Sequence, residues 1–280
     1  FHAFWADEPG LVAGLAGKWL HRPVIVSSAG GEFVYLPDIQ YGTSGSRFRR
    51  AVVRLALQLA DVATAGSRYQ EDLCLIQRVP AERVKRLPLG VETDHFGTAP
   101  LPAGPLTMVQ AGSLIPVKNQ RLLIAILARV RAQIPDAQLL VAGKGPLWAT
   151  LVQQAEGMQI AGAINWLGEI AYPDMPAVYA QAHLYVQTSR HESQGMAVLE
   201  AMACGRPVVG TPVGVARELA LLPDTMNPAG FAHKITQLWS DQVLLRQKSK
   251  QASAMVQEHY ALSRVVECFN DLYVRVKALK

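Results

Sequence analysis

The chain has 280 residues, of which 50% are hydrophobic and 18% charged, and its formal net charge is +5 at pH 7. This composition excludes a disordered or low-complexity protein and is typical of a globular chain with one large core or two medium ones, and we expect two domains. Apolar stretches such as LLIAILARV reach an arginine long before the ~18 residues that a membrane span requires.

Helix and strand patterns alternate along the first hundred residues. The predicted elements are a helix over 11–20, a strand over 23–28, a long helix over 47–60, a strand over 62–67 and a helix near 68–77. This order favours a parallel sheet covered on both faces. The chain starts without methionine inside an apolar segment, so we expect a first domain, residues 1–97, that is incomplete at its N-terminus. Prolines and glycines over 97–106 predict an interdomain linker.

The same alternation continues in the second domain, residues 106–245. Its predicted strands are 106–112, 138–142, 164–167, 183–188 and 207–211, and its predicted helices are 119–132, 146–156, 174–181 and 195–203. We therefore predict a doubly wound sheet, in which ligands bind beyond the carboxyl ends of the strands. Residues 246–280 have a helical apolar stripe that includes Val265, Leu272 and Val276.

Two carboxylates flank a predicted helix start in the segment SRHESQGMAVLEAMACGRPVVGT. Glu192 lies in the loop, Gly195 at the helix start, and Glu200 about two turns into the helix. The first backbone N–H groups of a helix have no intrahelical acceptor and lie at its positive end, so this loop is a natural seat for a phosphate or diphosphate. Arg190 and His191 are either further donor contacts or solvated loop residues.

The spacing of Glu192 and Glu200, followed by AMACGRPVV, resembles the signature of retaining GT-B glycosyltransferases of family 4, the group 1 glycosyl transferases. QAGSLIPVKNQRLLIAIL is similar to the strand, loop and helix that carry the donor-phosphate lysine of that family, and LLVAGKGP and INWLGEI resemble its next two loops. The resemblance covers almost the whole chain. It implies two Rossmann-like domains and a last helix that crosses back to the first domain.

The resemblance also implies a reaction, namely sugar transfer from a nucleotide sugar to an acceptor hydroxyl with retention of configuration and without a metal ion. It assigns catalytic roles to Glu192 and Lys118. The donor-binding residues that it implies are Gly112, Ser113, Lys118, Gly143, Leu167, Gly168, Glu169, Glu192, Ser193, Gln194, Gly195, Met196, Ala197 and Glu200. Gly30 and Gly31 form a turn after a strand and are predicted at the acceptor-side edge of the same cleft.

Several positions depart from the family pattern. Ser113 stands where many members have an arginine, Asn119 where a glycine is usual, and Ala29 where a histidine often lies near the sugar. The stretch from Gly214 to Gly230 lacks the usual glycine-rich link. Two other functions therefore stay open: a catalytically silent sugar-nucleotide-binding domain, and a GT-B epimerase or phosphorylase.

Other motifs and composition limit cofactors and partners. GKGPLW lacks the third glycine of a dinucleotide fingerprint, and no P-loop sequence occurs. Three widely spaced cysteines and seven scattered histidines predict neither disulfides nor a metal site, so we expect no cofactor and a cytoplasmic protein. The cluster of Arg47, Arg49, Arg50 and Arg54 leads an apolar helix, which is either a solvated helix start or a peripheral contact with an anionic membrane. The sequence has no basic patch interleaved with aromatic residues, so we expect no nucleic-acid binding.

Overall fold

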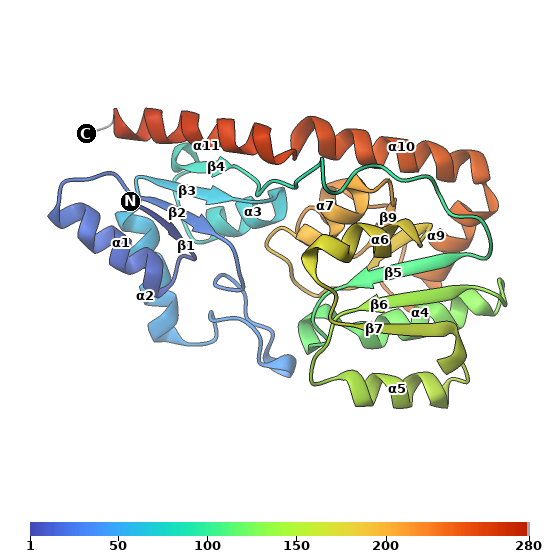
Figure 1. The fold of residues 1–280 in the computed structure, drawn as a ribbon. Coiled ribbons are helices and arrows are strands. Elements are labelled where there is room, and N and C mark those ends of the chain that lie inside the picture. The colour runs from blue at the N-terminus through green and yellow to red at the C-terminus, as the bar shows by residue number, and fades with distance from the viewer. Residues whose placement is uncertain (279–280) are drawn as a thin grey trace.

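A computed structural model describes residues 1–278 and has two α/β domains, each built on one parallel sheet. Figure 1 shows the first domain in blue and cyan and the second in green to orange, with two long helices running along one side of both. The first sheet has the strand order β1-β2-β3-β4 and the second the order β7-β6-β5-β8-β9. The predicted fold class, with two parallel α/β domains, is confirmed.

The first domain alternates short buried strands with helices. Its elements are β1 (His2–Phe4), α1 (Glu8–Trp19), β2 (Ile25–Ser28), α2 (Arg47–Leu59), β3 (Val62–Ala65), α3 (Arg68–Ile76) and β4 (Val84–Arg86). Both β2 and β3 are buried at every residue, as expected for central strands of a sheet covered on both faces. Val53 and Leu57 of α2 pack on Val26 and Ala63 in this core.

The second domain is larger and its sheet is covered by two apolar clusters. Its elements are β5 (Thr107–Ala111), α4 (Gln120–Arg131), β6 (Gln138–Ala142), α5 (Trp148–Gly157), β7 (Ile164–Gly168), α6 (Met175–Ala180), β8 (Leu184–Gln187), α7 (Met196–Ala203), β9 (Val208–Gly210), α8 (Ala216–Leu219) and α9 (Pro228–Ser240). All strands are parallel, and the order in which they are added reverses at β5, which pairs with β6 on one side and β8 on the other. This switch point opens a crevice beyond the carboxyl ends of these strands.

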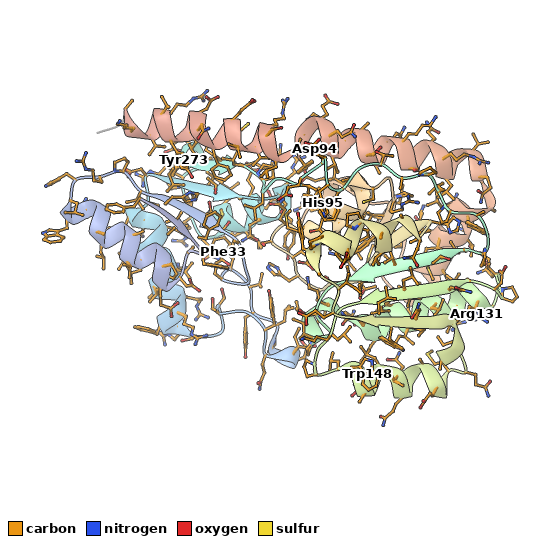
Figure 2. The ribbon with its side chains drawn as sticks, in the orientation of Figure 1. Phe33, Asp94, His95, Arg131, Trp148 and Tyr273 are labelled. Carbon is orange, nitrogen blue, oxygen red and sulfur yellow. The ribbon has the colours of Figure 1, made fainter. Side chains whose placement is uncertain are left out.

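The last two helices connect the domains. The chain runs through α10 (Gln242–His259), which lies over the second domain, into α11 (Leu262–Lys277), which lies over the first (Figure 1). Leu272 and Val276 of α11 pack on Ile25 and Val62 of the first sheet. Tyr273, labelled in Figure 2, projects from α11, and its hydroxyl is 2.9 Å from Nδ1 of His2. The C-terminal segment therefore holds both domains along one edge.

The connection between the domains is fixed by hydrogen bonds. The backbone of Val91 forms hydrogen bonds with the backbone at the junction of α10 and α11. A Cβ on the neighbouring Gly90 would lie 2.6 Å from Cα of Leu262. Only glycine lets the two backbones approach so closely. Further along, the buried Arg206 donates to the carbonyl oxygens of Ala99 and Pro100. The stretch predicted as a linker is thus tied to the second domain.

The sequence patterns missed several elements. Residues 84–86, for which no strand was predicted, form β4, which pairs with β3 in parallel. The segment after Gly214, which lacks the family's glycine-rich link, folds into α8 and α9. Helix α9 begins with the Asn227 side chain accepting from the N–H of Gly230 and with proline at its first position, both favourable at a helix start.

Candidate active site

A cleft of about 510 Å³ lies beyond the carboxyl ends of β5 and β6. Of the predicted donor residues it is lined by Gly112, Ser113, Gly143 and Glu169. Gly143 has a φ of +136°, and a Cβ there would lie 2.1 Å from the carbonyl oxygen of Gly112. The two loops can therefore touch only because position 143 is glycine. The N–H of Gly143 donates to the carbonyl of Gly168, which ties the third loop to the same edge.

Lys118 and Glu192 meet although 74 positions separate them. Lys118 ends the short turn η3 (Pro116–Lys118) after β5, and Glu192 lies in the loop after β8, the neighbouring strand. Nζ of Lys118 is 2.6 Å from Oε1 of Glu192, and the hydroxyl of Ser189 donates to the same oxygen at 2.7 Å. The Arg190 N–H also donates to the Val117 carbonyl, so the two loops are fixed together.

Helix α7 begins directly beside this pair. Gly195 precedes its first residue and has a φ of +94°, which few other residues adopt. The N–H groups of Met196 and Ala197 belong to the first turn and have no acceptor within the helix. A negatively charged group at this position would meet both these N–H groups and the positive end of the helix.

Glu200, one turn further along α7, is held in place by a tyrosine. The buried Tyr179 of α6 donates its hydroxyl to Oε2 of Glu200 at 2.9 Å. Burial raises the pKa of the Glu200 carboxyl, and the Tyr179 hydrogen bond partly opposes this shift. Glu200 does not line the 510 Å³ cleft itself. Leu167 and Met196 do not line it either, and both pack against the apolar cluster that includes Val198 and Leu199 of α7.

The loop from 190 to 194 turns most of its side chains toward the first domain. Ser193 donates to the carbonyl of Ala29, and the Gln194 side chain exchanges two hydrogen bonds with the backbone of Leu89. Both residues were predicted to bind the donor. Since their side chains bond the first domain, the prediction now applies only to their backbone N–H groups. Arg190 forms a bidentate pair with Asp38 instead of contacting the donor side.

The turn at Gly30 and Gly31 lies at the domain boundary, opposite this loop. The N–H of Gly30 donates to the buried Glu32 carboxylate at 2.8 Å, so it is not available to donor phosphates in this arrangement. The Gly30 carbonyl faces His191 of the second domain at 3.1 Å. Gly31 accepts backbone hydrogen bonds from Val34 and Thr43. Gly30 thus contacts the second domain, whereas the hydrogen bonds of Gly31 stay within the first.

The family profile described as glycosyl transferases group 1 matches residues 105–241. This segment is a group 1 glycosyl transferase domain. Among curated proteins, the chain is 30% identical over 236 residues to the GDP-mannose-dependent alpha-(1-6)-phosphatidylinositol monomannoside mannosyltransferase of Mycolicibacterium smegmatis, covering 78% of this chain and 60% of that protein. It is 30% identical over 166 residues to the N-acetyl-alpha-D-glucosaminyl L-malate synthase of Bacillus anthracis, covering 57% of this chain and 43% of that protein.

The group 1 glycosyl transferase domain and the domain before it together have the GT-B fold. Anabaena HepE in complex with UDP superposes with a TM-score of 0.81 at 21% identity, covering 96% of this chain and 76% of that one. Sucrose-phosphate synthase from Thermosynechococcus elongatus superposes with a TM-score of 0.77 at 22% identity, covering 100% and 74%. The chain thus spans less than two thirds of its first curated relatives and about three quarters of these structural ones.

The cleft of the group 1 glycosyl transferase domain also includes residues that were not predicted, among them Lys144 and Met175. Lys144, exposed next to Gly143, lines the cleft together with Met175 and pairs with Glu169. A lysine between two glycines after a buried strand was a signal that could have drawn attention to Lys144.

Asn119, at the usual glycine position, has a φ of +53° and so keeps the left-handed conformation that asparagine tolerates.

Residues 1–278 show neither a metal-ligand cluster nor a membrane-spanning helix. No group of three or more His, Cys, Asp or Glu side chains within this range could hold a metal ion. Within the same range, every helix is too short or too polar to cross a bilayer.

Proposed function

We propose that this protein transfers a sugar from a nucleoside diphosphate sugar to an acceptor hydroxyl, with retention of configuration and without a divalent metal ion. The observation that carries the proposal is the Lys118–Glu192 pair beside the start of α7, at the switch point of the second sheet. It combines a cation, a carboxylate and unpaired helix N–H groups within one crevice, which is what a diphosphate and a sugar require.

In the proposed mechanism, Lys118 exchanges Glu192 for the diphosphate when the donor binds. Its ammonium group and the N–H groups at Met196 and Ala197 then face the oxygen that gains charge as the sugar departs. Groups aimed at developing charge stabilise the transition state more than the ground state. Glu192, released from Lys118, is free to accept hydrogen bonds from hydroxyl groups of the donor sugar.

The nucleoside end of the donor is assigned to Glu200 and to the loop from Leu167 to Glu169. The Tyr179 hydrogen bond fixes one oxygen of Glu200, which leaves the other for the ribose hydroxyls. Lys144 lines the same cleft as Ser113, but its exposed ammonium group pairs with Glu169, so we assign it no contact with the diphosphate. In this proposal the nucleotide lies between the cleft and Glu200, and the Lys118–Glu192 end holds the sugar.

The comparisons suggest which donors to test. The mannosyltransferase relative is named as GDP-mannose-dependent, a Streptococcus gordonii relative is named for UDP-N-acetylglucosamine, and Anabaena HepE has been crystallised with UDP-glucose. We therefore propose a thermal-shift panel of GDP- and UDP-sugars, because a ligand that binds only the folded state raises the unfolding temperature. The panel is run with and without EDTA to test whether binding needs a metal.

The reaction itself is tested with the donor that the panel identifies. The proposal is supported if the protein transfers the sugar to an acceptor and hydrolyses the donor only slowly, and if the Glu192→Gln variant loses this transfer. Tight binding without transfer to any acceptor in an extended panel would favour a silent binding domain. Conversion of the nucleotide sugar without an acceptor would favour an epimerase or phosphorylase. Anomeric configuration is read by NMR of the product, and an inverted product contradicts retention.

We also propose that α2 lets the protein touch an anionic membrane surface. The helix begins with Arg47, Arg49 and Arg50, and Phe48 among them is 76% exposed. Trp19, at the end of the neighbouring α1, is 81% exposed. Exposed aromatic rings among basic residues are typical of interfacial helices. Cosedimentation with phosphatidylglycerol vesicles but not with phosphatidylcholine vesicles, weakened in Phe48→Ser, supports the contact, and equal binding to both vesicle types refutes it.

A further inference from the structure

The loop from 190 to 194, here called the docking loop, holds both the donor end of the site and the first domain. Glu192 faces Lys118 within the second domain. Every other side chain of the loop bonds the first domain, Arg190 through Asp38, Ser193 through Ala29 and Gln194 through Leu89. In addition, Ser67 of the first domain donates to the Ser193 carbonyl. Any opening between the domains therefore acts on the loop that carries Glu192.

His191 lies at the centre of these contacts and is only 2% exposed. Its Nε2 is 3.1 Å from the carbonyl oxygen of Gly30, and its Nδ1 is 3.3 Å from the Tyr69 hydroxyl. A carbonyl oxygen only accepts, so Nε2 carries the proton, and in a neutral ring Nδ1 then accepts from Tyr69. Burial lowers the pKa of His191, which favours this neutral ring. The tilted ring of Tyr41 packs on it, with centroids 5.8 Å apart.

The first domain presents its acceptor for His191 in a fixed orientation. The buried Glu32 carboxylate accepts from the N–H groups of Ala29 and Gly30, at 3.0 and 2.8 Å. The N–H groups of both residues are thus held on one side, and their carbonyls face the docking loop. The Ala29 carbonyl accepts from Ser193, and the Gly30 carbonyl contacts His191. The side chain at position 29 is only a methyl group. The imidazole at this boundary therefore comes from the second domain.

We propose that His191 is a positioning residue, which locks the docking loop onto the Ala29–Gly30 turn and so fixes Glu192 relative to the first domain. The inference rests on the proposed function, because this contact, here called the lock, would orient the donor sugar toward an acceptor that binds the first domain. Lys118, Glu200 and the start of α7 all belong to the second domain. Release of His191 therefore leaves donor binding intact and lowers transfer.

The kinetic test compares His191→Ala, His191→Gln and Arg217→Ala. Arg217 of α8 pairs with Asp72 of α3 across the same boundary without contacting the docking loop, which makes its variant a matched control. We expect His191→Ala to lower kcat by about tenfold or more, as expected when a positioning contact is lost, with an unchanged Kd for the nucleoside diphosphate. Glutamine, which can still donate to Gly30, should restore part of the rate. The exposed pair of Arg217 should change kcat by less than about threefold.

A distance measurement separates this inference from the proposed function. Spin labels at Val12 on α1 and Glu156 on α5, both exposed, report the separation of the domains in a Cys268→Ser background that removes the exposed native thiol. With bound UDP or GDP, whichever the panel selects, His191→Ala should broaden the distance distribution, whereas Arg217→Ala should not. If no acceptor is ever found but the distribution broadens, the proposed transfer fails while the lock stands.

The inference is overturned if His191→Ala keeps both the narrow distribution and the kcat of the unchanged protein. It is also overturned if kcat and donor affinity fall together, since that result would place His191 on the donor. Should the alanine variant not fold, Tyr69→Phe provides the same test, because it removes the hydroxyl that His191 Nδ1 accepts from. An unchanged distribution and rate in that variant and in His191→Gln would then reject the lock.

Discussion

Replacement of Lys118 by alanine tests the proposed charge stabilisation most directly. The Lys118 side chain is 27% exposed, between bulk water and the interior, so an effective dielectric constant of about 20 suits this position. Two unit charges ~4 Å apart then interact by about 4 kcal/mol. The bound diphosphate is already charged, so only the charge that develops as the sugar departs contributes to kcat. We therefore expect kcat to fall about 10²–10³-fold, the usual loss on removing one such donor.

The assay is steady-state transfer with the identified donor, together with calorimetry of the nucleoside diphosphate. Lys144→Ala is the matched control, because Lys144 lies in the loop after the neighbouring strand β6 but is 73% exposed and pairs with a similarly exposed Glu169. Solvent screens such a charge, so we expect its loss to change kcat by less than about threefold. Equal effects of the two substitutions, or a Lys118→Ala kcat within about threefold of the unchanged enzyme, would refute the assigned role.

Three further predictions concern affinity, pH and stability. Glu200→Gln should weaken nucleoside diphosphate binding about tenfold, since charge-assisted hydrogen bonds to the ribose are lost, and an unchanged Kd in calorimetry would remove the ribose role. Because the pKa of buried His191 is lowered from 6.5, its neutral ring contributes stability above that value and the contribution is lost as pH falls below it. The unfolding temperature should therefore fall more steeply on acidification in the unchanged protein than in His191→Gln, and parallel pH curves would contradict this. Gly143→Ala should destabilise the fold by about 2–3 kcal/mol in urea, because its Cβ would overlap the Gly112 carbonyl at a positive φ, whereas Gly162→Ala, with open space around its Cβ, should change it by less than about 0.5 kcal/mol.

The fold was predictable where the periodicity was long enough to be read. Helix α4 and strand β6 were predicted to within about two residues, because a run such as LLIAILARV has one apolar face and ends at polar residues. Strand β4 has only three residues, two of them exposed, so its sequence has no alternation to detect. It forms because β3 offers a partner edge. Helix α9, in contrast, had a readable start at Asn227 and Pro228 that was missed.

The candidate site was predictable only as far as one domain determines it. Lys118 and Glu192 meet because their loops follow adjacent parallel strands, and the carboxyl ends of such strands share one edge. The orientations of the side chains of Ser193, Gln194 and His191 could not be predicted from the strand order. They are set by hydrogen-bond partners in the first domain, more than a hundred positions away, and depend on how the two domains meet.

Two of the positions that depart from the family pattern have a basic side chain from another loop nearby. Ser113 has no charge, yet Lys144 from the next loop lines the same cleft. Ala29 has no imidazole, yet His191 reaches the adjoining Gly30 from the other domain. In each case a group from another loop lies close to the position that departs from the pattern. Lys144 is exposed and paired with Glu169, whereas His191 joins the two domains, so we expect His191→Ala to lower transfer and Lys144→Ala to change kcat by less than about threefold.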